Sequence, residues 1–308
     1  MKQCTDTILM VRPANFGYNP ETADNNVFQQ NNLSRSIEEI AELAMQEFDE
    51  LVKRMDAVDI NVVVIEDTAQ PKKTDAVFPN NWFTTHIDGR IFLYPMYSPN
   101  RRLERRNDIV DHLKETYEFN EVKSFAAHEH GGAILEGTGS MILDRPNKII
   151  YACLSQRTDF RLLDQLSIEL GGYEVVAFVA VDDQSIPYYH TNVIMTLGDD
   201  LAIICLESIE GESERNMVMA KLRSTGKVIV DITKDQVLKY CGNMLQVNNA
   251  KGEQYMVMSQ SARDNLTPSQ LSQIESYVTI LSSPLDIIEE YSGGSARCML
   301  AELFLPKK

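Results

Sequence analysis

One short pattern occurs five times along the chain, and it constrains the fold more than any other feature. Each copy is a β-hairpin opened by polar or charged residues, followed by a helix and then by an extended segment. The hairpins open at Asn80-Asn81-Trp82-Phe83, Glu136-Gly137-Thr138-Gly139, His190-Thr191-Asn192, Cys241-Gly242-Asn243 and Arg297-Cys298-Met299. Repetition on this scale is typical of modules that pack against their neighbours in an array or a ring.

The segments between the hairpins carry helix signals. Ser36 to Glu39 forms a capping box, and Thr267-Pro268 places proline at a first helical position. Helical spacing of apolar residues then predicts helices that begin near Ser36, Arg102, Asp159, Ser213 and Thr267. Extended runs are expected after the helices at 60–65, 122–126, 173–181, 227–232 and 286–290.

The fifth hairpin is divided between the two ends of the chain. Residues 7–11 are expected to pair with residues 299–304, which closes a ring of five units. The prediction is an α/β fold, a five-fold pseudosymmetric β/α propeller with helices outside and a central pore. The alternative is an open α+β sheet without symmetry. No linker composition interrupts residues 1–308, so we expect a single catalytic domain. The long polar loop at 13–32 is a candidate lid.

Composition narrows the classes of function. The formal charge of −16 argues against a nucleic-acid partner, because binding to phosphates needs an excess of Lys and Arg. No apolar run is long enough to span a membrane, and no secretory signal is expected at the N-terminus. The five cysteines are scattered without a paired spacing, which favours a reducing cytoplasm over a disulfide scaffold. An acidic enzyme acting on a small molecule fits best.

Three residues at hairpin openings could carry chemistry together. Cys298 is a candidate nucleophile, with Arg297 beside it to favour the thiolate. His190 is the candidate acid and base, and Glu136 the carboxylate that orients it. A lone cysteine or histidine is more often structural, and Cys153 and Cys205 are assigned to the core. Cys4 and Cys241 are left open. The equivalent placement of the three residues in different repeats is what favours the catalytic interpretation.

Two other clusters are interpreted as structural. His128-Glu129-His130 has metal-like spacing but no third ligand in the sequence, so no metal site is predicted there. The arginines at 101, 102, 105 and 106 are interpreted as a solvated helix face paired with nearby acids.

The chain resembles the guanidine-modifying enzyme superfamily, which includes arginine deiminases, dimethylarginine hydrolases and amidinotransferases. It is most similar to the branch of citrulline-utilisation hydrolases. The resemblance covers essentially the whole chain and rests on residues 78–86, 135–140, 190–192 and 293–300. It implies the pentein fold, which is the five-fold β/α propeller, and no cofactor. It also implies Cys298 as nucleophile, His190 as acid and base, Glu136 as the buried carboxylate, and Asn80 as a contact of the substrate carboxylate.

The departures from arginine deiminases bear on the substrate. His86 stands where those enzymes have an aspartate that grips the guanidinium, and Asn192 stands where they have a second aspartate. A buried guanidinium needs anionic partners, whereas a neutral ureido group needs neutral donors and acceptors. The change therefore favours citrulline, although Asp182 or Asp183 could still enter the site. Asn80, Asn81, His86, Asn192 and Arg297 are the predicted substrate-binding residues, with Arg12 a further candidate for the substrate carboxylate.

The predicted function is thus a cysteine-dependent hydrolase that converts citrulline to ornithine through an S-carbamoyl intermediate. Arginine deimination and transfer of the group to an amine are the enzymatic alternatives, and a non-catalytic ligand-binding propeller is the other. We expect a small-molecule substrate with a ureido or guanidino group, no nucleic-acid or membrane partner, and leave a homodimer open.

Overall fold

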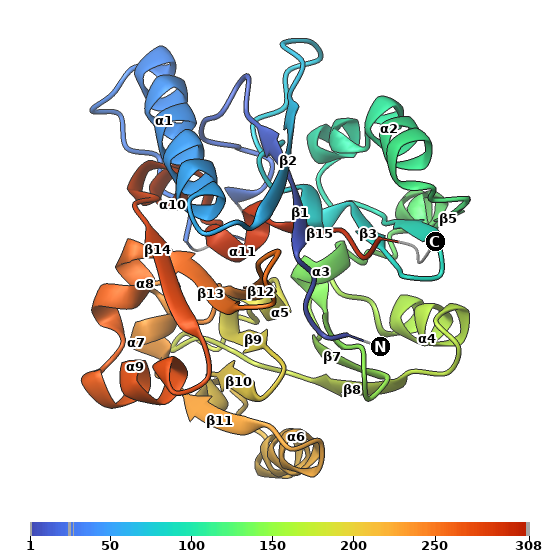
Figure 1. Ribbon diagram of the computed structural model, residues 1–308, viewed down its shortest axis with the longest axis vertical. Helices are drawn as coiled ribbons and strands as arrows, with labels where there is room; N and C mark the ends of the chain where they lie inside the picture. Colours follow the sequence, from blue (N-terminus) through green and yellow to red (C-terminus); the bar gives the residue numbers. More distant parts are fainter. Residues whose placement is uncertain (1, 24–25, 27, 306–308) are drawn as a thin grey trace.

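The computed structural model describes residues 2–23, 26 and 28–305. Within them lie five three-stranded sheets that share one topology: the first two strands form an antiparallel hairpin, and the third pairs in parallel with the second. Figure 1 shows the sheets arranged around the centre of the molecule. The strands are β3 (Phe83–Thr85), β4 (Arg90–Leu93) and β5 (Glu121–Ser124); β6 (Ile142–Asp144), β7 (Ile149–Cys153) and β8 (Glu174–Phe178); β9 (Met195–Leu197), β10 (Leu201–Ile204) and β11 (Val228–Asp231); β12 (Leu245–Asn248), β13 (Gln254–Ser259) and β14 (Thr279–Ser283); and β15 (Ala301–Glu302), β1 (Thr7–Arg12) and β2 (Asn61–Glu66).

A helix joins the second strand of each sheet to its parallel third strand, and these helices lie on the outside (Figure 1). They are α1 (Ile37–Asp56), α2 (Asn107–Tyr117), α4 (Phe160–Glu169), α6 (Glu212–Ser224) and α9 (Pro268–Glu275). The sequence signals hold at three starts: Ser36 caps α1, Asp159 caps α4, and Thr267 forms a capping box with Gln270 ahead of α9. Further helices are α7 (Lys234–Val237), α8 (Gln260–Asn265) and α10 (Asp286–Ser292), with 3-10 turns η3 (Pro99–Glu104), η4 (Ala126–Gly131) and η5 (Leu206–Ser208).

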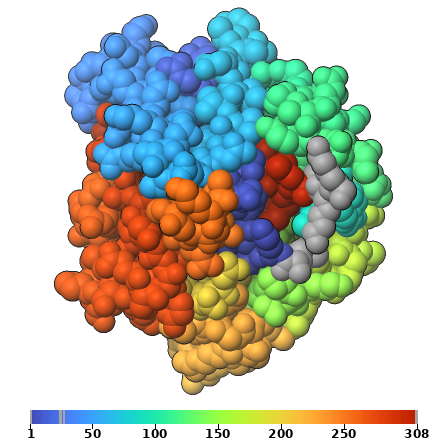
Figure 2. All heavy atoms as spheres, in the orientation of Figure 1, coloured from blue at the N-terminus to red at the C-terminus, as the bar shows by residue number. Residues whose placement is uncertain are grey.

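The expected closure between the two ends of the chain is confirmed. β1 pairs antiparallel with β15, with Ile8 opposite Glu302, and pairs in parallel with β2 on its other side. The space-filling view shows the first strand, in dark blue, beside the red C-terminal residues at the middle of the molecule (Figure 2). The N-terminal strand is therefore the central strand of its sheet, and not an appended edge.

Two boundary predictions were wrong. Residues 286–290 were expected as a strand but belong to α10, and the third strand of that unit is β14, one segment earlier. The run Ile287-Ile288 is apolar because this helix is buried at the centre, and apolar runs of this length do not distinguish strand from helix. The helix expected from Arg102 is divided into η3 and α2, with a break at Arg105 and Arg106.

The residues that open each hairpin form short helical turns rather than the first residues of strands. These turns are η2 (Pro79–Asn81), α3 (Gly137–Ser140), α5 (Thr191–Ile194) and α11 (Ala296–Met299), with a turn at 241–242 in the fourth unit. η2 packs against α3 and α11, and α3 packs against α5. The polar motif residues of different units are thereby brought together.

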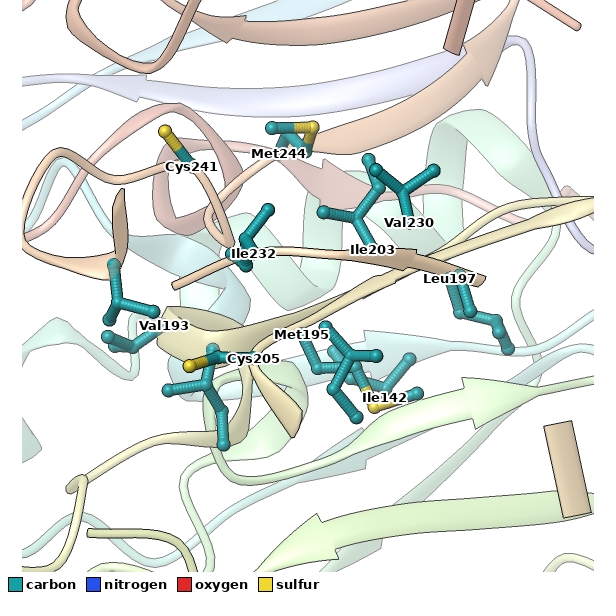
Figure 3. Close-up of a cluster of buried hydrophobic side chains, with 14 of the residues drawn as sticks. Ile142, Val193, Met195, Leu197, Ile203, Cys205, Val230, Ile232, Cys241 and Met244 are labelled. Carbon is teal, nitrogen blue, oxygen red and sulfur yellow. The ribbon is translucent and has the colours of Figure 1, made fainter. Parts of the chain in front are cut away.

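Apolar side chains fill the space between the sheets and the outer helices. Figure 3 shows part of the largest cluster, in which Met195, Ile203 and Val230 from the third sheet lie close to Cys205 and Met244. Of the helices in the described part of the chain, none is long and apolar enough to cross a membrane.

Leu9 tests whether the fold depends on the closing strand. Its side chain is fully buried in β1, so Leu9→Ala should lower the free energy of unfolding by about 2–5 kcal/mol in a denaturant titration. Val64→Ala on the neighbouring β2 is the control, because Val64 is 38% exposed and should change stability by less than about 0.5 kcal/mol. Equal effects of the two substitutions would contradict the proposed dependence.

Candidate active site

Cys298 lines a cavity, and none of the other four cysteines lines that cavity. The cavity is lined by Thr22, Asn26, Asp75, Phe78, Asn81, Arg101, Arg157, Tyr189, His190, Ser292, Gly294 and Cys298. Burial raises the pKa of Cys4, raises that of Cys205 to about 11, and raises those of Cys153 and Cys241 to about 12. Cys205 and Cys241 lie among aliphatic side chains (Figure 3). These four thiols are therefore poor candidates for a nucleophile.

Two asparagine amides donate hydrogen bonds to the sulfur of Cys298. Asn243 Nδ2 lies 3.2 Å from Sγ and Asn192 Nδ2 lies 3.4 Å from it. The two residues come from the third and fourth units, whereas Cys298 comes from the turn α11 of the fifth. A sulfur with negative charge accepts such bonds better than a neutral thiol does, so this arrangement suits a thiolate nucleophile.

His190 lines the same cavity and forms a buried pair with Glu136. His190 Nε2 lies 2.7 Å from Glu136 Oε2, and Glu136 Oε1 accepts a hydrogen bond from the backbone N–H of Tyr97 at 2.8 Å. An ionised carboxylate only accepts hydrogen bonds, so this network assigns the proton to His190 Nε2 and leaves Nδ1 as the basic nitrogen.

Glycine makes this packing feasible. A Cβ on Gly139 would lie 2.8 Å from His190 Nδ1 and 2.5 Å from Asn81 Nδ2. Gly137 has φ of +48°, and a Cβ there would lie 2.4 Å from the carbonyl oxygen of Asn80. The Gly-Thr-Gly sequence therefore allows three units to approach closely, within a one-turn helix.

The pKa values of the pair follow from burial and from neighbouring charges. Burial lowers the pKa of His190 to about 4, with smaller contributions in the same direction from Arg157 and Arg101 and an opposing one from the bond to Glu136. Burial alone would raise the pKa of Glu136, but Arg157, the bond to His190 and Arg101 outweigh it, so the pKa falls. The resting pair at neutral pH is thus a neutral imidazole and an ionised carboxylate.

Two buried arginines line the cavity. Arg101 forms a two-pronged ion pair with Glu104 at 2.9 Å and donates to Asn81 Oδ1 at 2.9 Å. Arg157 lies 3.5 Å from Glu136 and stacks on the ring of Tyr189, with its guanidinium 4.8 Å from the ring centre. The interpretation of the 101–106 arginines as a solvated helix face was wrong for Arg101, which is 3% exposed.

The cavity is also lined by a carboxylate, that of Asp75, which the sequence did not indicate. Asp75 is buried, and its Oδ2 accepts a hydrogen bond from Asn19 Nδ2 at 2.6 Å. Burial raises its pKa, although Arg101, with Nε 3.7 Å away, opposes this. The expected alternatives, Asp182 and Asp183, lie elsewhere: Asp182 accepts from backbone groups of its own turn, and Asp183 pairs with Lys234.

The polar loop at 13–32 contributes to the cavity wall. Thr22 and Asn26 line the cavity, and Asn26 Nδ2 donates to the carbonyl of Ser292 at 2.8 Å. Residues 24, 25 and 27 of this candidate lid lie outside the described residues.

The structure does not bring His86 and Arg297 to the cavity. His86 lies 3.0 Å from Thr84 Oγ1 and 3.4 Å from an Arg145 nitrogen, and burial keeps its pKa well below the usual range. The Arg297 side chain turns to the opposite side of α11, where it donates to Leu300 O and to Glu302 at 2.8 Å. Consecutive residues of a short helix point in different directions, so Arg297 does not accompany Cys298.

The remaining predicted residues are distributed as follows. Asn81 lines the cavity, Asn192 contacts the sulfur, and Asn80 is buried beside them with its Nδ2 directed at Thr138. Arg12 pairs with Asp49 at the surface of α1. In the segment 128–130, Glu129 accepts from Arg105 and from the backbone N–H of Met96. The described residues hold no group of three potential ligands suited to a metal ion.

A family model described as eukaryotic N,N dimethylarginine dimethylhydrolase matches residues 12–305. The chain belongs to this family. Its predicted membership of the guanidine-modifying superfamily is confirmed. No curated protein matches the chain.

Solved structures share the fold of this family member. Apo ArgZ, an arginine dihydrolase from the ornithine-ammonia cycle in cyanobacteria, aligns with a TM-score of 0.75 at 16% identity over 98% of this chain, which spans 41% of ArgZ. The N-terminal domain of ArgZ, as an asparagine-to-serine variant covalently bound to a reaction intermediate, gives 0.73 at 17% identity over 97% and 99% of the two chains. A dimethylarginine dimethylaminohydrolase variant in an adduct with S-methyl-L-thiocitrulline gives 0.63 at 12% identity over 97% and 100%.

The protonation state of His190 can be tested directly. Its imidazole should stay neutral as the pH falls and titrate at about pH 4, well below the ~6.5 of an unperturbed histidine. Because the folded pKa is depressed, the histidine costs stability as the pH falls from about 6.5 towards 4. Histidine-selective NMR across this range measures the titration, and His190→Gln identifies the signal. A midpoint near 6.5 would disprove the buried neutral pair.

Proposed function

We propose that residues 1–308 form a single catalytic domain, a five-bladed β/α propeller, that hydrolyses the ureido group of an α-amino acid, with citrulline as the best candidate. The observation that carries the proposal is the set of groups around Cys298. Two amide donors contact its sulfur, and His190, which lines the same cavity, is paired with the buried carboxylate of Glu136. A nucleophile, a base and a group that orients the base are the components of covalent catalysis.

The proposed reaction has two steps. The thiol proton passes to His190 Nδ1, and the sulfur attacks the ureido carbon. The bond from that carbon to the alkyl nitrogen breaks, His190 gives the proton to the departing amine, and ornithine leaves an S-carbamoyl cysteine. In the second step His190 takes a proton from water, and the water oxygen attacks the carbamoyl carbon. The bond from that carbon to sulfur then breaks, and His190 returns the proton to the sulfur. The product, carbamic acid, decomposes to carbon dioxide and ammonia. Glu136 keeps the imidazole in the required tautomer throughout.

The rest of the cavity suits the zwitterionic end of an amino acid. Arg101 and Arg157 place positive charge on the cavity wall, where it attracts a substrate carboxylate. Asp75 Oδ1 has no hydrogen-bond partner among the described residues, so it can accept from an ammonium group. This assignment replaces Arg12 and Arg297 as the predicted partners of the substrate carboxylate.

The amides favour a ureido group over a guanidinium. Arg101 is only a donor, so its bond to Asn81 Oδ1 fixes that side chain and directs Nδ2 elsewhere, and within residues 2–23, 26 and 28–305 Nδ2 has no partner. Asn192 Oδ1 is likewise without a partner in that part of the chain. The site thus offers a donor as well as an acceptor. A ureido group has a carbonyl oxygen for the donor, whereas a guanidinium has only N–H groups.

Arginine is the second candidate substrate. Asp75 gives the cavity one carboxylate, and ArgZ, with the same fold, is an arginine dihydrolase. Transfer of the group to an amine would use the same nucleophile with the amine in place of water. A non-catalytic propeller is the least favoured, because it gives no reason for the buried groups around Cys298.

The proposal is tested by incubating the protein separately with citrulline and with arginine and identifying the products by mass spectrometry. Ornithine from citrulline is the expected result. Cys298→Ser should reduce turnover by at least about a thousandfold and leave the fold intact, since an alcohol is a poor nucleophile here. Cys205→Ser serves as the control and should keep activity, because Cys205 lies in the hydrophobic core away from Cys298. Turnover by the Cys298→Ser variant near that of the original protein would remove this residue from the mechanism.

The charge of the substrate is tested at Asn81. Asn81→Asp replaces the N–H donor that lines the cavity with a carboxylate oxygen, which would pair with a guanidinium and repel a ureido oxygen. A buried polar mismatch costs about 1–3 kcal/mol. The ratio of kcat/KM for arginine to that for citrulline should therefore rise about tenfold or more.

The control for this experiment is Asn265→Asp, which adds the same charge at an exposed position far along the chain. It should leave the ratio unchanged. The neutral-site argument fails if the original protein already prefers arginine, or if Asn81→Asp leaves the preference as it was.

A further inference from the structure

We propose that Asn243 is a catalytic residue: its carbonyl fixes the turn that carries Cys298, and its amide N–H stabilises the sulfur as a thiolate. The inference rests on the proposed function only in taking Cys298 as the nucleophile. Asn243 stands at the opening of the fourth hairpin, and no role was predicted for it from the sequence.

Every polar atom of the Asn243 side chain is engaged. Oδ1 accepts a hydrogen bond from the backbone N–H of Arg297 at 3.0 Å, and Nδ2 donates to the carbonyl of Asn192 at 3.0 Å and to Cys298 Sγ at 3.2 Å. Because the Arg297 N–H can only donate, it fixes which end of the amide is oxygen. The N–H group is therefore directed at the sulfur by geometry and cannot exchange places with the oxygen.

The turn that carries Asn243 is itself rigid. Cys241 and Met244, on either side of it, are fully buried in the hydrophobic cluster of Figure 3. Between them Gly242 packs so closely that a Cβ would lie 2.4 Å from the carbonyl oxygen of Val193. The backbone N–H of Asn243 donates to Tyr240 O at 2.8 Å. A donor held in this way needs no rearrangement when charge develops on the sulfur.

The sulfur receives its hydrogen bonds from neutral groups. Those given by the described residues come from Asn243 and Asn192, while the adjacent cation, Arg297, faces the other way. The two amides are not equivalent, because Asn192 Oδ1 has no partner within the described ranges and is available to a substrate. Asn243 has no such atom, because its Oδ1 and Nδ2 are both engaged, so its contact with reacting atoms is limited to the sulfur.

The decisive variant is Asn243→Asp. It keeps the acceptor for the Arg297 N–H and the shape of the side chain, but it replaces the N–H at the sulfur with an anion. The rate of Cys298 alkylation by iodoacetamide at pH 7.5, followed by peptide mass spectrometry, should fall about tenfold or more, because a bond to a charged acceptor is lost and a repulsion is added. In turnover, kcat should fall while KM changes little.

Two further variants keep the test independent of folding. Asn243→Ser has a side chain too short to reach the sulfur and adds no charge, and it should show the same loss of alkylation. Asn249→Ala is the matched control: Asn249 is also buried and also donates to a backbone carbonyl, that of Val58 at 2.9 Å, but it does not contact the sulfur. It should lose stability and keep the alkylation rate. Near-UV circular dichroism identifies which variants are folded.

The inference is overturned if a folded Asn243→Asp or Asn243→Ser variant alkylates at the rate of the original protein. It is also overturned if Asn249→Ala slows alkylation as much as they do. Alkylation requires no substrate, so a failure to hydrolyse citrulline would count against the proposed function and leave this result standing.

Discussion

Pairing of β1 with both β15 and β2 is the interaction on which the rest of the structure depends. It makes the N-terminal strand the middle of a sheet whose other strands are far away in sequence. The segment of β15 and Phe304 is joined to the first unit through Thr85. Its Oγ1 donates to Glu302 O at 3.0 Å and accepts from the backbone N–H of Phe304 at 2.8 Å. The turn α11 lies directly before β15. The position of Cys298 relative to the other units is therefore set by this pairing.

Buried charge at the centre is the second constraint. Glu136, Glu104 and Asp75 lie around Arg101 and Arg157 with little exposure to solvent. Removing ions from water is costly, and the cost is offset only when each ion has well-placed partners. Burial raises the pKa of Glu104 to about 7 in spite of Arg101, whereas the pKa of Glu136, between two arginines and His190, is lowered. Folding thus fixes the polar groups of the cavity in place before any ligand arrives.

The sequence predicted the architecture well because the pattern of hairpin, helix and extended segment occurs five times along the chain. Capping residues and hairpin turns act locally, so Ser36, Asp159 and Thr267 marked helix starts correctly. The site was predicted only where a residue stands in a repeated motif. Cys298, His190 and Asn81 stand in such motifs and line one cavity, with Glu136 paired to His190, whereas Arg157 and Asp75 line it from outside the motifs and gave no signal.

The errors at the site came from side-chain direction. Arg297 adjoins Cys298 in sequence yet points away from the cavity, and His86 follows β3 into a pocket of its own beside Arg145. Conversely, Arg101 was assigned to a solvated surface because it stands among other arginines. Its pairing with Glu104 is local, but its bond to Asn81 joins it to a different turn and leaves no signal in the neighbouring sequence. The direction of these side chains is decided by packing between units, and a single sequence gives no information about that packing.

The placement of β1 also bears on how the molecule is made. β1 is synthesised before the other four sheets, while β15 is synthesised after them. Loops that long are closed late, because their entropy must be paid before the contact stabilises anything. The intervening sheets can form meanwhile, since each hairpin and its following helix are local. During synthesis one edge of β1 can pair early with β2, whereas the edge that pairs with β15 stays open until the last strand is made and is exposed to pairing with other chains until then.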